Sequence, residues 1–169
     1  MTCRLAGEIG EFLKVGGNAN PDSVPHYHRL LAEGARRGPE GRKRTRLVYG
    51  TVTLIDSNRA VAERLARREV AMYIGVVGRM DPTSPVDAEE LDSVEEAMRA
   101  GDPRRAGEAL SEETLRRFCC YGTPDDICAQ MKVLFDAGLD LFEFGTPHGE
   151  DEAQGIRLLG EAVLPQFRE

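Results

Sequence analysis

Apolar residues follow two different periods along the chain. Residues 12–15 (FLKV), 47–56 (LVYGTVTLID) and 139–149 (LDLFEFGTPHG) are short apolar runs, and the second is apolar on both parities, as in a strand covered on both faces. The intervening segments carry apolar residues at helical spacing. These patterns predict three strands, the last followed by a loop, and helices over residues 3–9, 20–35, 86–102, 110–123, 123–138 and 150–167. A further long helix is expected to begin after a cap at Asp56, Ser57 or Asn58 and to run through Met80.

Residues typical of helix starts and helix ends support several of these boundaries. Asn20 precedes Pro21, and Thr123 precedes Pro124, so each is expected to cap a helix that begins with proline. Gly138 follows the second of these helices and predicts its end. The segment 110–123 is interpreted as one helix that begins at Ser111 and ends at Gly122.

The order of the elements predicts an α/β fold. Each predicted strand is followed by a helix, which favours parallel pairing with right-handed crossovers. Three strands cannot close a (β/α)8 barrel, which takes eight strands and about 250 residues. The first predicted helix, 3–9, starts without a cap and leads directly into a strand. We therefore expect residues 1–169 to form part of a larger unit.

Composition excludes some functions. The net charge of -7 argues against a nucleic-acid partner, and the basic run at 36–46 is interpreted as a solvated loop because glycine and proline interrupt it. Neither a signal peptide nor a membrane-spanning apolar run is visible, so the prediction is a cytoplasmic protein without membrane contact. The four cysteines lack metal-ligand spacing, and Cys119 and Cys120, as neighbours on a strand, would point to opposite faces. No metal site is predicted.

Several motifs together resemble one family. The segments LAGEIG, LKVGGNANPDSV, RFCCYGTPDDICAQM, FDAGLDLFEFGTPHG and GIRLLGEAVLP resemble the C-terminal half of luciferase-like oxidoreductases that depend on a flavin or a deazaflavin. The VGGNANPD stretch is most similar to the methylenetetrahydromethanopterin reductase-like branch. The resemblance runs from Leu5 to Pro165, although Glu11-Phe12 stands where relatives tend to have Asp-Gly.

The resemblance implies a fold and a chemistry. The fold would be a partial (α/β)8 TIM barrel, in which 12–15, 47–55 and 141–144 are strands six, seven and eight. The activity would be hydride transfer between a reduced cofactor, coenzyme F420 or FMN, and a small organic substrate, possible only together with the N-terminal half. The alternative is a non-catalytic half-barrel that pairs with another chain. The expected partners are accordingly a small-molecule substrate and either a second copy of the chain or an N-terminal half.

Candidate ligand-binding residues follow the predicted strands, because barrel ligands bind at the carboxyl ends of the strands. After the first strand, Gly16 and Gly17 permit close approach, and Asn18 or Asn20 can hydrogen-bond a ligand carbonyl, unless Asn20 serves only as a cap. After the last strand, His148 is the candidate proton donor, with a purely structural histidine as the alternative. Glu143, if it points inward, needs a polar partner. The predicted binding set is Gly16, Gly17, Asn18, Asn20, Glu143, Gly145, Thr146 and His148, and no catalytic residue is assigned.

Overall fold

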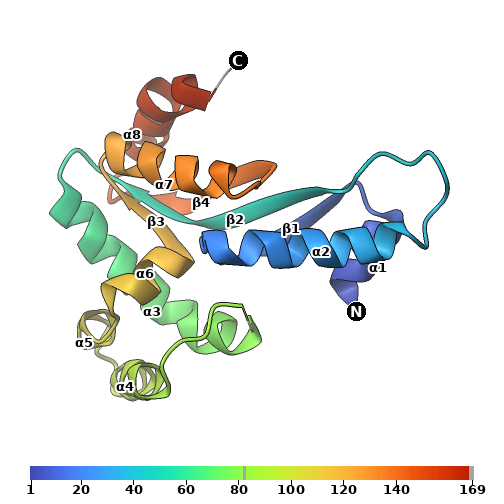
Figure 1. The fold of residues 1–169 in the computed structure, drawn as a ribbon. Helices are drawn as coiled ribbons and strands as arrows, with labels where there is room; N and C mark the ends of the chain where they lie inside the picture. The colour runs from blue at the N-terminus through green and yellow to red at the C-terminus, as the bar shows by residue number, and fades with distance from the viewer. Residues whose placement is uncertain (82, 168–169) are drawn as a thin grey trace.

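The protein is built around a parallel four-stranded sheet. A computed structural model describes residues 1–81 and 83–167 of the 169-residue chain. The strands are β1 (Phe12–Gly16), β2 (Arg46–Ile55), β3 (Cys119–Gly122) and β4 (Leu141–His148). All the pairings are parallel, as the alternation of strands and helices predicts (Figure 1).

Strand β2 is the centre of this sheet. One edge of β2 pairs with β1 along residues 46–50 and then with β3 along 52–55, so these two short strands share one edge. The other edge pairs with β4 from Val48 to Leu54. Within the described residues, β1 and β4 each pair with β2 alone, so each leaves its outer edge without a strand.

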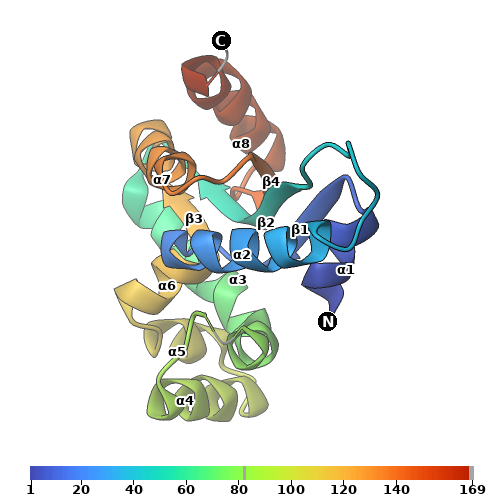
Figure 2. The same ribbon diagram turned by 45° about the vertical axis from the view of Figure 1, so that its right-hand side comes forward.

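One face of the sheet is covered by helices from both ends of the chain. A hydrophobic cluster on this face joins Leu13, Leu47, Tyr49 and Cys120 to residues of the flanking helices. The helices involved are α1 (Thr2–Ile9), α2 (Val24–Ala35), α7 (Pro124–Asp136), α8 (Glu152–Leu158), the π-helix η2 (Leu159–Val163) and η3 (Leu164–Phe167). The short helix η1 (Pro21–Ser23) leads directly into α2. Figure 2 shows α7 and α8 beside the strands, with α2 and α1 along the other part of the sheet.

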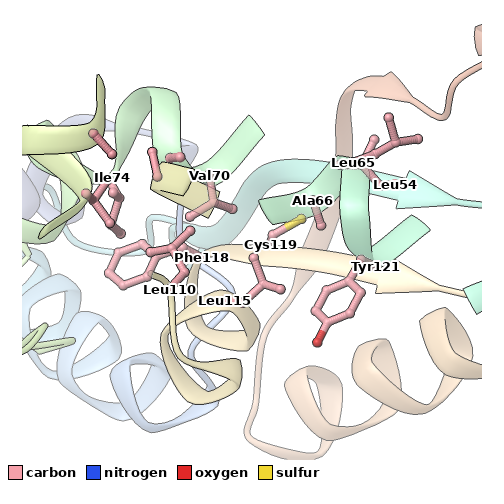
Figure 3. Packing of buried hydrophobic residues seen from close by; sticks show 14 of the residues in the cluster. Leu54, Leu65, Ala66, Val70, Ile74, Leu110, Leu115, Phe118, Cys119 and Tyr121 are labelled. Carbon is pink, nitrogen blue, oxygen red and sulfur yellow. The ribbon is translucent and has the colours of Figure 1, made fainter. Parts of the chain in front are cut away.

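The opposite face is covered only towards the carboxyl ends of the strands. A second cluster there packs Leu54 and Cys119 against α3, with Phe118 and Tyr121 beside them (Figure 3). It is built from α3 (Arg59–Met80), α4 (Ala88–Arg99), α5 (Pro103–Glu108) and α6 (Glu112–Phe118). Cys119 and Cys120 belong to different clusters, which confirms that they point to opposite faces of the sheet.

The segment 110–123 is not one helix, and this prediction was wrong. Helix α6 ends at Phe118, and Cys119–Gly122 forms β3. The predicted cap is present, because the Ser111 side chain accepts a hydrogen bond from the backbone N–H of Thr114. Tertiary pairing with β2 overrides the helical pattern, because the four residues of β3 find parallel partners at Val52–Ile55.

Helix boundaries elsewhere follow the sequence signals. Asn20 accepts a hydrogen bond from the backbone N–H of Asp22, and Thr123 forms a complete capping box with Asp126.

Strand β4 extends to His148, four residues beyond the 141–144 expected from the resemblance. Helix α5, at Pro103–Glu108, was not predicted.

Asp140 ties the amino-terminal ends of β2 and β4 together. Its carboxylate accepts hydrogen bonds from the Leu47 N–H at 2.8 Å and from the Arg44 guanidinium. Burial alone would raise the pKa of Asp140, but these two donors outweigh it and hold the pKa below the ordinary value of 3.8.

Replacing Asp140 with asparagine is expected to remove an acid-sensitive part of the stability. A lowered native pKa stabilises the fold above the unfolded-state pKa, and this contribution is lost as the pH falls through the native pKa. We therefore expect D140N to cost about 1–2 kcal/mol at pH 7 and progressively less below about pH 4. Thermal melting between pH 7 and pH 2.5 measures this, with Asp136→Asn on the exposed side of α7 as the control. An equal loss at every pH would contradict the assignment.

Candidate functional site

The predicted ligand loops lie where the carboxyl ends of β1 and β4 meet α3 and α8. Gly16 ends β1, and the N–H of Gly17 continues the ladder by donating to the carbonyl of Gly50 at 2.8 Å. Gly17 has a φ of +68°, which glycine adopts without strain. A side chain at Gly17 would meet Val77 of α3 at 3.3 Å, so α3 lies directly against this turn.

The two predicted amide ligands, Asn18 and Asn20, hydrogen-bond the protein itself. Both are almost fully buried, at 2% and 4% exposed. The amide of Asn18 donates to the Asp81 carboxylate, and that of Asn20 donates to the Ser84 hydroxyl at 2.8 Å. These bonds join the loop after β1 to the connection between α3 and α4. A ligand role for Asn18 or Asn20 remains a prediction, and binding would require these bonds to be exchanged.

Asp81 is the centre of this polar group. Besides Asn18, its carboxylate accepts from the Thr83 N–H at 2.8 Å, from the Thr83 hydroxyl at 2.6 Å and from the Tyr27 hydroxyl at 3.3 Å. Burial, and secondarily the Asp81 charge, raises the pKa of Tyr27, so Tyr27 stays a neutral donor. The group fastens α3 to the end of β1.

A neighbouring hydrogen bond holds the segment after β1 against strand β2 in the core. The hydroxyls of Ser23 and Tyr49 lie 2.5 Å apart in the core. Burial raises the pKa of Tyr49, which keeps this phenol neutral as well. These side chains therefore serve as buried hydrogen-bonding groups of the fold.

Glu143 points to the sheet face that the described helices cover only towards the carboxyl ends of the strands. The Lys14 ammonium lies 2.7 Å from both oxygens of the Glu143 carboxylate, and each side chain is 54% exposed. An inward Glu143 was expected to need a polar partner, and Lys14 is that partner. Gly50 is on β2, which lies between β1 and β4. A Cβ at Gly50 would come within 2.7 Å of the Lys14 Cε.

The predicted residues Gly145, Thr146 and His148 lie within the carboxyl-terminal half of β4, not in a loop after it. His148 has a φ of +71°, and its Nε2 lies 3.1 Å from the Phe144 carbonyl. Its Nδ1 is 3.6 Å from the Glu152 carboxylate, beyond hydrogen-bonding distance. A Cβ at Gly145 would lie 2.6 Å from the Thr51 carbonyl, so glycine allows the close strand approach there, and Thr146 is exposed. A binding role for these three residues remains a prediction.

The predicted residues thus fall into separate groups. Asn18 and Asn20 form one group with Asp81, whereas Gly16 and Glu143 flank Gly50 on neighbouring strands. The sequence reasoning missed Lys14 and Asp81. Lys14 had a visible signal, since it is a lone charge inside an apolar strand, but its contact with Glu143 spans 129 positions.

None of the described helices is both long enough and apolar enough to span a membrane. The described residues also contain no group of three or more histidine, cysteine, aspartate or glutamate side chains arranged to hold a metal ion.

Comparisons with known proteins agree on one family. The model of the luciferase-like monooxygenase family matches residues 1–141. The chain is similar to 5,10-methylenetetrahydromethanopterin reductases of Methanopyrus kandleri and Archaeoglobus fulgidus, at 25% and 24% identity over 98% of this chain. It covers 48% and 51% of those proteins, so the chain spans about half the length of the curated relatives it matches.

Solved structures show the same relation. The coenzyme F420-dependent tetrahydromethanopterin reductase from Methanopyrus kandleri superimposes with a TM-score of 0.84 at 26% identity, over 98% of this chain and 48% of that one. The oxygenating constituent of 3,6-diketocamphane monooxygenase from Pseudomonas putida, in complex with FMN, reaches 0.60 at 20% identity, covering 97% of this chain and 45% of that one, which supports the fold alone. The parallel sheet therefore matches half of a luciferase-like TIM-barrel protein, as the sequence resemblance predicted.

Proposed function

Because this chain belongs to the luciferase-like monooxygenase family, and its relatives are oxidoreductases that use F420 or FMN, we propose that it forms the C-terminal part of such an enzyme. Strands β1, β2 and β4 take the places of barrel strands six, seven and eight. The activity is hydride transfer between reduced F420 or FMN and a small organic substrate. It requires five further βα units, in the same polypeptide or in a second one.

The uncovered part of the sheet carries this proposal. The outer edges of β1 and β4 are without strands in the described structure, and exposed strand edges favour pairing with another chain. Phe12 and Leu141, on the face that carries Lys14, are 43% and 36% exposed. A closed barrel buries this face, because its helices lie outside the strands.

Counting strands distinguishes the two predicted kinds of partner. A second copy of this chain would bring three more strands with barrel positions, and six strands are too few for a barrel of eight. Strand β3 does not change the count, because it lies in line with β1 along the same edge of β2. The partner that fits is a five-strand complement rather than a second copy.

The uncovered face of this sheet offers features suited to a flavin or deazaflavin. A Cβ built at Gly16 meets nothing within 4 Å, so the backbone there is open to close approach. Lys14 and Glu143 supply a donor and an acceptor on the same face. The cofactor, when bound, supplies the hydride chemistry, and this chain's residues bind and orient it.

Complementation tests this function. The chain is mixed with the half of the Methanopyrus kandleri reductase that it does not match. We expect one complex by size-exclusion chromatography and F420- or FMN-dependent oxidoreductase activity that neither half shows alone. As a control, Leu141→Glu places a charge on the surface that closes and is expected to prevent assembly. Failure to associate, with both halves folded, would overturn the proposal.

The same experiment addresses the alternative of a non-catalytic half-barrel. The free edges alone favour pairing and require no chemistry. A stable complex that neither binds F420 or FMN nor turns over a substrate would support this alternative.

A further inference from the structure

A small cavity lies between α3, α6 and α7 at the end of β3. Its lining includes Arg59 of α3, Arg116 of α6, Tyr121 of β3, and Asp126 and Gln130 of α7, and its volume is about 160 Å³. Pockets for drug-sized ligands measure about 300–1,000 Å³, so this cavity suits a much smaller molecule. The predicted binding residues are not among those that line it in the described structure, so it is separate from the candidate site.

The Tyr121 hydroxyl has no hydrogen-bond partner among the described residues. Tyr121 is only 3% exposed, and Figure 3 shows its hydroxyl pointing away from the other labelled side chains of the cluster. Most buried polar groups in folded proteins have a partner, because leaving one unpaired is unfavourable. Burial raises the pKa of Tyr121, and the Arg116 charge opposes this shift only in part, so the phenol stays neutral. It is therefore available to donate to an acceptor.

The two arginines at the cavity also retain donors. Arg116 donates from Nε and Nη2 to one oxygen of Glu112, at 3.1 and 2.8 Å, and its Nη1 has no partner in the described part of the chain. Arg59 donates from Nη1 to Asp126 at 3.1 Å, whereas its Nη2 is 3.8 Å from Glu112. A guanidinium group has five N–H donors, so each arginine can donate to a further acceptor.

The charges around the cavity favour an anion that displaces one carboxylate. Helix α3 begins at Arg59 and α7 at Pro124, and the amino-terminal ends of helices attract anions. Asp126 is held in place, since it accepts from the Thr123 N–H and hydroxyl, both at 2.9 Å. The Glu112 side chain, in contrast, is 59% exposed. Glu112 is therefore the carboxylate that an incoming anion can replace.

We propose that Tyr121, Arg59 and Arg116 bind a small tetrahedral oxyanion, either free phosphate or the phosphate group of a monoester, which replaces Glu112 on Arg116. Such an anion presents acceptor oxygens in several directions, and guanidinium groups match it well. The Tyr121 oxygen has less than 1 Å² exposed, so the anion reaches it when the half-exposed Arg116 side chain shifts. This site uses residues of this chain alone, and it does not depend on the proposed function.

NMR titration of the 169-residue chain at constant ionic strength tests this site. The probes are inorganic phosphate for the free anion and glycerol 3-phosphate for the monoester, and amide shifts of Tyr121 and Asp126 report binding. Tyr121→Phe removes only the hydroxyl, Arg59→Gln removes one guanidinium, and Glu112→Gln removes the competing charge. The matched control is Glu40→Gln, at an exposed position between α2 and β2.

We expect saturable binding, weakened about tenfold by Tyr121→Phe or Arg59→Gln and unchanged by Glu40→Gln. Glu112→Gln should bind about fivefold more tightly, because the anion no longer competes with a carboxylate for Arg116. Tighter binding of glycerol 3-phosphate than of inorganic phosphate identifies a monoester as the ligand, and the reverse order identifies the free anion. Without a probe, Tyr121→Phe should melt at the wild-type temperature, because its hydroxyl has no protein hydrogen bond to lose.

Three outcomes overturn this assignment: no saturable binding of either probe, shifts confined to other parts of the chain, or equal affinities in Tyr121→Phe and wild type. A Glu112→Gln variant that binds no more tightly than wild type would reject the displacement of Glu112. If Tyr121→Phe does not fold, Arg59→Gln decides, because the Arg59 side chain is 49% exposed and its replacement leaves the core intact. Equal affinities in Arg59→Gln and wild type would then overturn the site.

Discussion

Replacing Phe118 with alanine is expected to lower the free energy of unfolding by about 3–5 kcal/mol, through the lost burial of the ring and the cavity left behind. Phe118 is fully buried where α6 ends and β3 begins, and it packs in the cluster beneath α3 (Figure 3). Its backbone carbonyl also accepts hydrogen bonds from the hydroxyls of Thr51 at 2.7 Å and Tyr73 at 2.6 Å. Loosening this residue therefore weakens the attachment of β3 and α3 to β2.

Urea denaturation followed by circular dichroism measures this loss. Ile156→Ala is the matched control, because Ile156 is 54% exposed on α8 and its truncation should cost well under 1 kcal/mol. A cost for Phe118→Ala below about 1 kcal/mol would show that the cluster collapses around the cavity or contributes little to stability.

The boundary between α6 and β3, which follows Phe118, could not be predicted from the local sequence. The residues before it carry a real helix signal, and the helix is present. The residues after it, Cys119–Gly122, are a strand only because Val52–Ile55 lie alongside them, more than 60 positions earlier in the chain. A window of local sequence contains the helical period but not the distant partner, so the boundary was placed four residues too late.

The strands and the family were more accessible. Strand β2 could be predicted because both alternating sets of positions along it carry apolar residues. This is a local property of a strand that lies between two layers. The motifs at 16–20 and 122–126 are turn and cap signals, and both caps are present. The family resemblance was readable because these motifs occur together and in order.

The candidate site could be predicted only in part from the sequence. That Asn20 caps a helix follows from its neighbours, whereas its bond to Ser84, and that of Asn18 to Asp81, depend on how α3 returns over the sheet. The same reason hid the contact between Lys14 and Glu143. Sequence reasoning located polar residues at strand ends but could not determine which of them the fold would already satisfy.

Replacing Asn18 with aspartate is expected to cost about 3–5 kcal/mol at pH 7, because it leaves a buried carboxylate facing the Asp81 carboxylate without a compensating charge. The substitution changes the shape of the side chain very little, so the effect is almost purely electrostatic. Like charges raise the pKa of such a carboxyl group. Lowering the pH should therefore recover part of the lost stability as one of the two carboxyls becomes protonated.

The double variant Asn18→Asp with Asp81→Asn is the decisive companion. It exchanges the amide and the carboxylate, so one donor again faces one acceptor, while the side chain at 18 can still accept from the Asn20 N–H and that at 81 from the Thr83 N–H. We expect the double variant to regain most of the stability lost in Asn18→Asp, as measured by urea denaturation. A double variant as unstable as the single one would show that the surroundings, including Tyr27, require the negative charge at position 81 itself.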